Sequence, residues 1–301
     1  MGGGNKELEE TFIERGYKVY EATYVKEKVC NNVFFLENFK KEKENYYIVV
    51  PWLEYNEKRV NLLKDLGYEL IKDCCFLKHE KQIIRLKAGE KYVDKLFNNY
   101  FYSESNNDIY VTLGEKANGS RVNIGKNVTG SLNIFIAASN NYISVHEDVA
   151  FYDTKVYMYA GTKLEIGEKT TFNSKCYFSI NHGCSIEVGK DCMFSFECVL
   201  HSGDGHAIYD LDTKQKVNMK SENSKITLGD HVWVGFRAMI LNNTTIGNGS
   251  IVGAGSLVKG IFPINCILAG SPAKVIKTNR AWARNPNALS IEECGEVYQL
   301  K

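Results

Sequence analysis

The chain has 301 residues, which is enough for two domains and a sizeable core. Its 37 basic and 36 acidic residues balance, so no excess charge attracts nucleic acid or an anionic membrane surface. The polar, acidic segment at residues 4–10 and the lack of a long uncharged apolar run predict neither a signal peptide nor a transmembrane helix, and favour a cytoplasmic location.

Residues 1–107 show no six-residue period and predict a small α/β module. Tyr46–Val50 is a β-rich run, an amphipathic stretch follows at 60–67, and residues 68–71 predict a return strand. A helix is expected at residues 91–102, leading out of the module. No G-x-G-x-x-G follows the first strand, so a packing or partner-docking role is at least as well supported as nucleotide binding.

From residue 108 a six-residue pattern begins loosely, with anchors such as Leu113 and Ile166 that glycine follows. Anchors resume at Val188 after a ten-residue gap from Phe178, which predicts a small insertion between them. We therefore place a repeat domain at residues 108–277.

The period is regular between Ile226 and Val258. Aliphatic anchors recur every six residues, and a second, mostly small series keeps the same step. The anchors are Leu228, Val234, Ile240, Ile246, Val252 and Val258, four of them followed by Gly229, Gly235, Gly247 and Gly253. This period fits neither a helix nor a strand alone and is typical of a hexapeptide parallel β-helix, with glycine at corners whose backbone angles other residues resist.

One polar stretch breaks the register. Leu200 and Leu228 are separated by 28 positions where 24 would keep the step, and residues 201–225 contain no anchor. Loops on a rigid scaffold are where chemistry concentrates. We expect this loop to leave the coil and carry the functional residues.

The nine cysteines predict no metal site and no disulfide. Cys74 and Cys75 are adjacent instead of forming a CxxC pair. Cys176, Cys192 and Cys198 fall at small inward positions of the repeat, where a thiol packs as a compact hydrophobe.

Three motifs in order, Asp204–His206 (DGH), Asp230–Gly235 (DHVWVG) and Ala269–Lys277 (AGSPAKVIK), resemble the hexapeptide-repeat acyltransferases. Over residues 110–280 the chain is most similar to O-acetyltransferases of capsular or lipopolysaccharide sugars, and more distantly to galactoside acetyltransferase. The resemblance implies a mainly β fold with a left-handed β-helix, assembled as a homotrimer with active sites between subunits. The remaining residues, 278–301, are expected to form a short helical tail.

On this pattern His206 is the general base that takes the proton from an acceptor hydroxyl as it attacks acetyl-CoA, and Trp233 lies close to the reaction centre. A base must itself be oriented. Asp204 is the first candidate for this role, with Glu197 and Asp210 as alternatives that spacing does not separate.

The other histidines carry weaker expectations. His201, at the coil edge, is expected to be structural ahead of catalytic. His182 could line an acceptor groove, and His231 flanks the tryptophan corner, where a hydrogen-bonded or surface histidine is common. His79 and His146 receive no function.

The resemblance lays acetyl-CoA along the last coils, where backbone groups hold the pantetheine and lysines meet the phosphates. The residues that it implies for this co-substrate are Gly235, Phe236, Gly253, Ala254, Lys259, Lys274 and Lys277. Gly260 departs from the family, where a lysine or similar polar residue is frequent, which puts one phosphate contact in doubt.

Three alternatives stay open. One is an N-acetyltransferase acting on a nucleotide-linked amino sugar. Another is a zinc lyase of the γ-carbonic anhydrase type, which would need His182, His201 and His206 as tetrahedral ligands. The last is a non-catalytic scaffold, in which the loop histidine would be dispensable. The motifs argue against zinc, and no metal is expected.

Overall fold

The computed structural model describes the four short strands at 21–23, 33–35, 48–50 and 74–76, together with residues 82–94, 97–218 and 224–295. The chain divides into two compact units, one formed by residues 1–80 with 94–98 and the other by residues 81–93 with 99–301. No helix of the described residues is both long enough and apolar enough to cross a membrane.

The first unit contains two parallel strand pairs among its described residues. The strands are β1 (Glu21–Thr23) with β2 (Val33–Phe35), and β3 (Ile48–Val50) with β4 (Cys74–Phe76). The strand predicted at Tyr46–Val50 is confirmed over its last three residues. The helix and return strand predicted at 60–67 and 68–71 lie outside the described residues.

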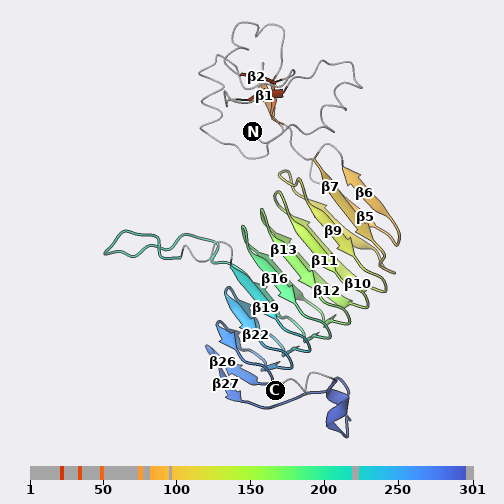
Figure 1. The fold of residues 1–301 in the computed structure, drawn as a ribbon, viewed down its shortest axis with the longest axis vertical. Coiled ribbons are helices and arrows are strands. Elements are labelled where there is room, and N and C mark those ends of the chain that lie inside the picture. Colours follow the sequence, from red (N-terminus) through yellow and green to blue (C-terminus); the bar gives the residue numbers. More distant parts are fainter. Residues whose placement is uncertain are drawn as a thin grey trace. The chain divides into compact units, whose positions relative to one another are not determined.

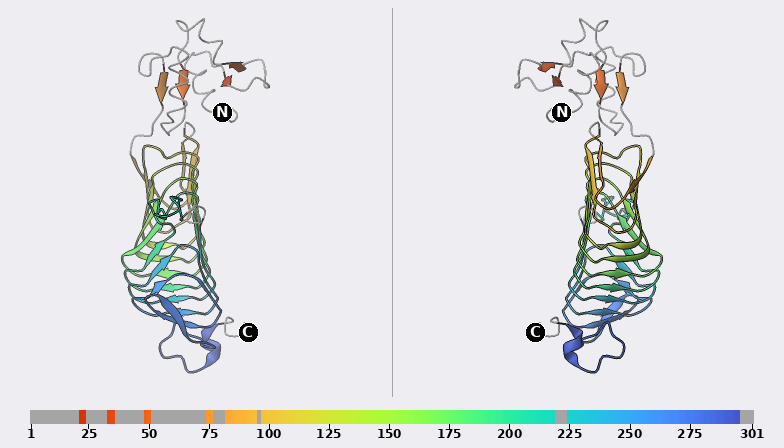
Figure 2. Two further views of the ribbon diagram at one scale, coloured as in Figure 1. Left: turned by 90° about the vertical axis from the view of Figure 1, so that its left-hand side faces the viewer. Right: turned by 90° about the vertical axis from the view of Figure 1, so that its right-hand side faces the viewer.

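The second unit is a β-solenoid whose coils stack along one axis (Figures 1 and 2). One face, called face 1, is a nine-stranded sheet of the described residues. Its strands are β6 (Lys91–Asp94), β7 (Asn99–Ser103), β9 (Arg121–Ile124), β11 (Tyr142–Val145), β13 (Lys163–Ile166), β16 (Ser185–Val188), β19 (Lys225–Leu228), β22 (Thr244–Ile246) and β25 (Ile261–Phe262). The predicted β-solenoid is confirmed, while its direction of winding stays a prediction.

A second sheet wraps the other two sides, because β12 (Ala150–Met158) pairs with one strand through its start and another through its end. Face 2 contains β14 (Thr171–Phe172), β17 (Met193–Phe194), β20 (Trp233–Val234), β23 (Ile251–Val252), β26 (Ile267–Gly270) and the antiparallel β27 (Ala273–Lys277). Face 3 contains β5 (Gln82–Leu86), β8 (Ile109–Leu113), β10 (Thr129–Ile136), the end of β12, β15 (Cys176–Ile180), β18 (Val199–His201), β21 (Met239–Leu241) and β24 (Leu257–Val258).

The helix predicted at residues 91–102 is wrong, because this stretch forms β6 and β7. In β7 the burial alternates with period two, and Phe101 is fully buried. Phe101 pairs in register with Val122 of the next coil and stacks on Tyr92, with ring centroids 5.3 Å apart. Packing against the first coil therefore overrides the helical spacing of these aromatic residues.

Coil size explains why the hexads are clear only late in the chain. Hydrogen-bonded partners in adjacent coils are 21 residues apart at Asn141–Thr162 and 22 apart at Thr170–Cys192. The separation falls to 18 at Asp230–Asn248 and 16 at Ser250–Cys266. The coil at Asp230–Asn248 thus has the length of three hexads, whereas the early coils are longer. The early coils are wider on face 3, where β15 has 5 residues and the later β21 has 3.

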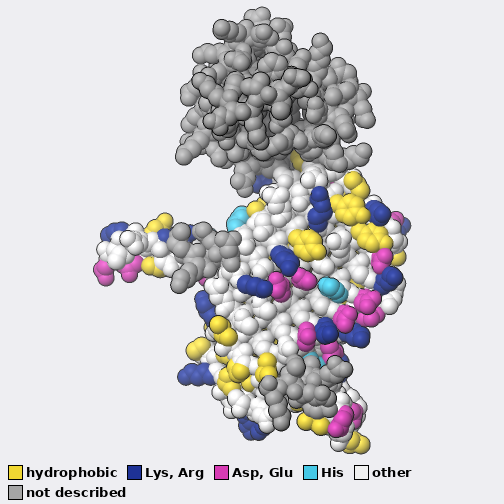
Figure 3. All heavy atoms as spheres, viewed as in Figure 1, with side chains coloured by type: hydrophobic (Ala, Val, Ile, Leu, Met, Phe, Trp, Pro, Cys, Tyr) yellow, Lys and Arg dark blue, Asp and Glu magenta, His cyan; other side chains and the backbone are white. Residues whose placement is uncertain are grey.

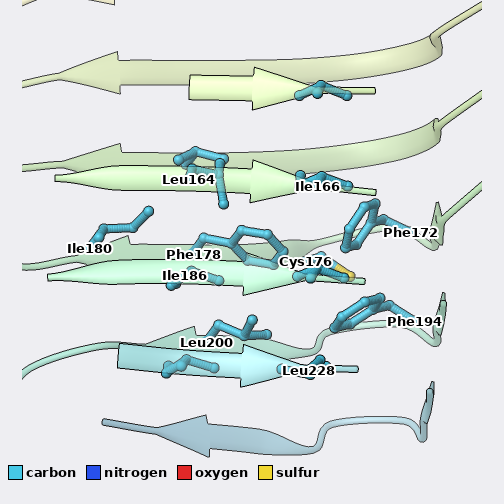
Figure 4. Close-up of a cluster of buried hydrophobic side chains, with 14 of the residues drawn as sticks. Leu164, Ile166, Phe172, Cys176, Phe178, Ile180, Ile186, Phe194, Leu200 and Leu228 are labelled. Carbon is cyan, nitrogen blue, oxygen red and sulfur yellow. The ribbon is translucent and has the colours of Figure 1, made fainter. Parts of the chain in front are cut away.

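The interior is a stack of aromatic and aliphatic side chains (Figure 4). Phe172 pairs in register with Phe151 on one side and Phe194 on the other, and its ring stacks on theirs at 5.0 and 4.5 Å. All three rings are fully buried, and each contributes about 1.5–3 kcal/mol through removal from water. Cys176, Cys192 and Cys198 are free and buried, and burial raises the pKa of the Cys192 thiol to about 12.

The glycines that follow the anchors are needed for a reason other than the one predicted from sequence. Gly229, Gly235, Gly247 and Gly253 are absent from the positive-φ residues of the solenoid. Instead, a Cβ at Gly235 would lie 2.7 Å from the carbonyl oxygen of Val252, and one at Gly247 would lie 2.5 Å from the nitrogen of Ile264. Close approach of one coil to the next therefore excludes a side chain at Gly235 and Gly247, while at Gly253 a Cβ would be tight, 3.2 Å from Leu268 O.

Candidate functional site

The predicted loop leaves the solenoid directly after β18 and forms an arm, defined here as residues 203–218 (Figure 1). Its two sides pair through a bridge between Tyr209 and Lys216 and through hydrogen bonds from Val217 N to Ile208 O at 2.8 Å and from Asp210 N to Gln215 O at 2.9 Å. Lys190 and Asp230 are hydrogen-bonded partners in adjacent coils but are 40 residues apart in sequence, because the arm lies between them.

The base of the arm is held by two asparagines that sequence reasoning missed. The Asp204 carboxylate accepts hydrogen bonds from Asn242 Nδ2 at 3.0 Å and Asn218 Nδ2 at 3.1 Å. Asn218 Nδ2 also donates to the backbone oxygen of His206 at 2.7 Å, and its Oδ1 accepts from Ile208 N at 2.9 Å. The backbone around His206 is thus fixed from both sides of the arm. Asn242 is buried at a corner, where a buried amide needs hydrogen-bond partners.

The His206 ring is exposed. The contacts among Asp204, Asn218 and Asn242 that fix the backbone beside it are called the clamp. None of the other described side chains forms a hydrogen bond with the His206 imidazole. Asp204 contacts amides instead of the ring, so its proposed orienting role stays a prediction. Glu197 pairs with Arg237 at 2.7 Å and Asp210 accepts from Thr213 N at 2.7 Å.

These contacts lower the pKa of Glu197, through the hydrogen bond from Arg237, and the pKa of Asp210, through the backbone N–H of Thr213. Among the described residues, neither carboxylate forms a hydrogen bond or an ion pair with His206. Both already stabilise local structure elsewhere.

His201 and the turn containing His182 flank the base of the arm. His201 is in register with Ser179 on one side and Leu241 on the other. The turn is tied to the arm, because Ser202 Oγ accepts from Asn181 N at 3.0 Å and a Cβ at Gly203 would lie 2.6 Å from Asn181 Nδ2. The exposed His182 ring lies 5.1 Å from the Tyr159 ring.

Trp233 is carried by face 2, whereas the arm leaves at the end of face 3. Its side chain is 37% exposed on β20, and its ring lies 5.9 Å from Trp282. His206 and Trp233, which the resemblance places near one reaction centre, are therefore on different sides of one chain.

The backbone positions predicted for the co-substrate stack on one another at a corner of the last coils. Gly235 N donates to Val252 O at 2.8 Å, and Gly255 N donates to Phe236 O at 2.7 Å. Phe236 is 41% exposed and lies under the Arg237 guanidinium, while Ala254 is exposed in the next coil. The structure thus brings the two predicted pairs together on an accessible surface.

Two of the predicted lysines lie at the same end. Lys274 pairs across the β26–β27 hairpin with Ala269, whose Cβ lies 3.2 Å from the position that a Cβ at Gly253 would occupy. Lys277 is at the end of β27 and is exposed. Lys259 is exposed immediately after β24.

A second cluster that the sequence did not reveal joins the C-terminal segment, defined here as residues 278–295, to the solenoid. Trp282 stacks on His231 at 3.9 Å and its Nε1 donates to His231 O at 2.8 Å. His231 Nδ1 lies 2.6 Å from Asp191 Oδ2 and its Nε2 lies 2.9 Å from Trp282 O. The His231 ring is therefore held at both of its nitrogens.

Arg284 completes this cluster. Its Nε donates to Asp191 Oδ1 at 2.5 Å, and its remaining nitrogens donate to Thr171 Oγ1 and to the backbone oxygens of Lys169 and Cys192. Burial alone would raise the pKa of Asp191, but the hydrogen bonds from His231 and Arg284 outweigh it and lower that pKa. The only helical turn described in this segment is the 3-10 helix η3 (Ile291–Cys294).

No cluster of three potential metal ligands occurs among the residues that the structure describes. On the face shown in Figure 3, basic and acidic side chains are interspersed. On face 1 they form ion pairs, such as Lys163 with Glu165 at 2.7 Å and Lys225 with Glu187 at 2.6 Å.

The chain is similar to proteins of known family and structure. Residues 225–260 match the family described as bacterial transferase hexapeptide (six repeats). The chain is 32% identical over 133 residues to a polysialic acid O-acetyltransferase of Escherichia coli O1:K1 / APEC, an alignment that covers 44% of this chain and 42% of that protein. It is 32% identical over 169 residues to a polysialic acid O-acetyltransferase of Neisseria meningitidis, covering 56% of this chain and 77% of that one.

A solved structure agrees with these sequence matches. The crystal structure of the polySia-specific acetyltransferase NeuO superposes with a TM-score of 0.55 at 28% identity, covering 67% of this chain and 85% of that chain.

Proposed function

Because this chain belongs to the bacterial hexapeptide-repeat acyltransferases, we propose that it transfers an acetyl group from acetyl-CoA to a hydroxyl of a surface polysaccharide or its precursor, in the cytoplasm where acetyl-CoA is available. The observation that carries this proposal is the arm. Its backbone is clamped through Asp204, Asn218 and Asn242, while the His206 ring is left exposed. A fixed backbone under an open imidazole suits a general base that must meet a diffusing acceptor.

The proposed reaction is direct transfer between two substrates. The oxygen of the acceptor hydroxyl attacks the thioester carbonyl while His206 accepts the proton of that hydroxyl. The new C–O bond forms, the C–S bond breaks, and the CoA thiolate takes the proton back from the imidazolium. The products are an acetyl ester and free CoA. A neutral hydroxyl needs this help at pH 7, and a positioned base typically contributes about 10²–10⁴-fold to the rate.

We propose that acetyl-CoA lies along the corner formed by Gly235, Phe236 and Ala254, with its phosphates near Lys274 and Lys277. The stacked, accessible backbone of these coils supports the pantetheine position. The β27 lysines are close to the same end through the pairing of Lys274 with Ala269. Lysine suits a mobile phosphate because it acts as a point charge on a flexible stem.

The placement of these groups supports our proposal of a homotrimer with shared sites. Trp233 and the arm with His206 are on different faces of one chain, as the strand order requires. A neighbouring copy would bring the arm of one subunit against face 2 of another. Sedimentation velocity tests this assembly, and a fully active monomer would contradict it.

The reaction itself is tested by release of free thiol from acetyl-CoA with a panel of sugars, both free and polymeric. Thiol release with sugars that carry hydroxyls and no amine, lost in His206→Ala, is the expected result. Release only with amino sugars would favour N-acetylation instead. No release with any acceptor would contradict the proposed activity.

A further inference from the structure

Face 3 of the early coils carries a continuous row of aromatic side chains on its outer surface. The Phe135 ring stacks on Tyr157 at 4.7 Å, Tyr157 lies 5.0 Å from Tyr159, and Tyr159 lies 5.1 Å from His182. These four residues are called the aromatic row. None of its members is buried, so the row presents ring surface to solvent.

The solenoid itself sets the spacing of the row. Phe135 and Tyr157 occupy paired positions in adjacent strands β10 and β12, with buried neighbours on either side of each. Tyr159 follows β12, and His182 is in the turn after β15. Partial burial is the main cause that raises the pKa of Tyr157, and the neighbouring hydroxyls of Tyr159 and Tyr177 raise it further. The phenol therefore stays neutral. The row is therefore a packed surface that continues from coil to coil.

The positions beside the row are polar but lack carboxylates. Asn133, Lys155 and Tyr177 follow one another in register on β10, β12 and β15. Face 1 at the same level differs, since Glu165 and Glu187 occupy its paired positions. Lys155 and the tyrosine hydroxyls give this part of face 3 hydrogen-bond donors and a positive charge beside aromatic rings.

The row ends at the base of the arm. His182 adjoins Asn181, whose backbone N–H donates to Ser202 Oγ and whose side chain contacts Gly203. The arm that carries His206 begins at this point, and His201 is the last residue of the neighbouring strand. A ligand that follows the row toward the late coils thus arrives at the candidate base.

We propose that the aromatic row is an extended binding surface for a glycan chain, on which sugar rings stack along Phe135, Tyr157 and Tyr159 while the residue to be acetylated lies near His206. This rests on the proposed function. A sugar ring has an apolar face that packs on an aromatic ring and hydroxyls at its edge that need donors and acceptors, and the row with its polar border supplies both. A glycan, as opposed to a second copy of the chain, is the occupant because the row is continuous with the candidate active site and each ring has a polar neighbour.

The first experiment measures acetyl transfer to short and long acceptors by Phe135→Ala and Tyr157→Ala. Tyr142→Ala is the control, because Tyr142 is an exposed tyrosine on β11 of face 1, outside the aromatic row. We expect the row variants to raise KM for long acceptors about tenfold, equivalent to about 1.4 kcal/mol. KM for short acceptors, KM for acetyl-CoA and turnover should stay unchanged, and the control should match the wild type.

The second experiment measures binding without catalysis. His206→Ala protein is applied to an array of bacterial glycans printed in short and long forms, with and without Tyr159→Ala. Preference for long chains that Tyr159→Ala removes supports the surface, even where no acetyl transfer is found. Absence of length preference for every glycan, an equal loss for short and long acceptors, or a loss of subunit assembly in the row variants overturns it. Melting temperatures identify any variant that fails to fold, and the Tyr159 variant then replaces it in the kinetic test.

Discussion

Two segments leave the coils of this solenoid, and they use the same kind of side chain in opposite ways. In the arm, His206 has its backbone oxygen bound by Asn218 and its ring exposed. At the C-terminal segment, the buried His231 has both ring nitrogens bound, to Asp191 and to the Trp282 backbone. A histidine that is held by its backbone can react, whereas one that is held by its ring stabilises a corner. We therefore expect changes in the arm to affect turnover, and changes at the C-terminal segment to affect stability.

Replacing the arm histidine should have the largest effect. His206→Ala removes the proposed base and should lower turnover by about 10²–10⁴, with acetyl-CoA affinity and melting temperature nearly unchanged. Steady-state kinetics and thermal unfolding provide the measurements. His201→Ala is the neighbouring control, and a larger loss of turnover there would show that the assignment of the base is wrong.

Replacing the C-terminal tryptophan should have the opposite signature. Trp282 is 5% exposed and stacks on His231, so Trp282→Ala should lower the free energy of unfolding by about 3–5 kcal/mol. Urea unfolding measures this loss. Leu289→Ala in the same segment is the control, because Leu289 is 95% exposed and its loss should change stability by less than about 0.5 kcal/mol. Equal effects would mean that the segment does not stabilise the corner through Trp282.

Replacing a residue of the clamp tests whether fixing the backbone of the arm matters to His206 as the proposed general base. Asn242→Ala removes a hydrogen bond to the Asp204 carboxylate, a contact that is worth about 1.5–3 kcal/mol when one partner is charged. We expect turnover to fall by about 10–100-fold. A double-mutant cycle with Asp204→Ala should be non-additive, because both residues act through one contact. Full additivity would mean that Asn242 does not act on the arm through Asp204.

The corner cluster should also give a pH-dependent contribution to stability. Hydrogen bonds from His231 and Arg284 lower the pKa of Asp191 despite its burial. Its stabilising contribution is therefore complete above the ordinary carboxyl pKa of about 3.9 and is lost as pH falls through the lower value in the folded protein. The melting temperature of the wild type should exceed that of Asp191→Asn at neutral pH, and the gap should close in acid. A gap that is constant with pH would contradict this role for the carboxylate.

The sequence predicted the architecture where the coil length equals three hexads, as at Asp230 and Asn248. It was less informative for the early coils, because residues added on face 3 change the spacing between anchors while the inward pattern is preserved. The helix expected at residues 91–102 failed for a related reason. The spacing of Tyr92, Tyr100 and Phe101 fits a helix, but the first coil offers an open edge that a strand such as β7 can pair with.

For the site, the break in the six-residue register predicted the arm, and the role of His206 stays a prediction, but no sequence pattern indicated the residues that hold the arm. Asn218 and Asn242 are far apart in the chain and meet only through Asp204, so no local pattern connects them. Trp282 and Arg284 were missed because their partners are 51 and 93 residues away. Contacts of this kind depend on how coils stack, which a period within the sequence does not encode.

The smallest predicted effect concerns the lysines at the entrance to the C-terminal segment, and it tests whether that end of the molecule is only structural. Lys274 and Lys277 are exposed on β27, whereas the contacts of the segment with the solenoid begin at Arg280, whose N donates to Asn265 O at 2.9 Å, and include Trp282. The phosphates of CoA carry negative charge, but exposed charge pairs are worth only about 0.2–1 kcal/mol and are screened by salt.

Lys274→Ala combined with Lys277→Ala should therefore raise KM for acetyl-CoA modestly, and more at low salt than at high salt. Turnover and melting temperature should change little. Acetyl-pantetheine lacks the nucleotide phosphates, so its use as a donor should be unaffected by the two substitutions. An equal loss with both donors would mean that the lysines support the fold of the hairpin, and the division between a reactive arm and a structural C-terminal end would then extend to β27.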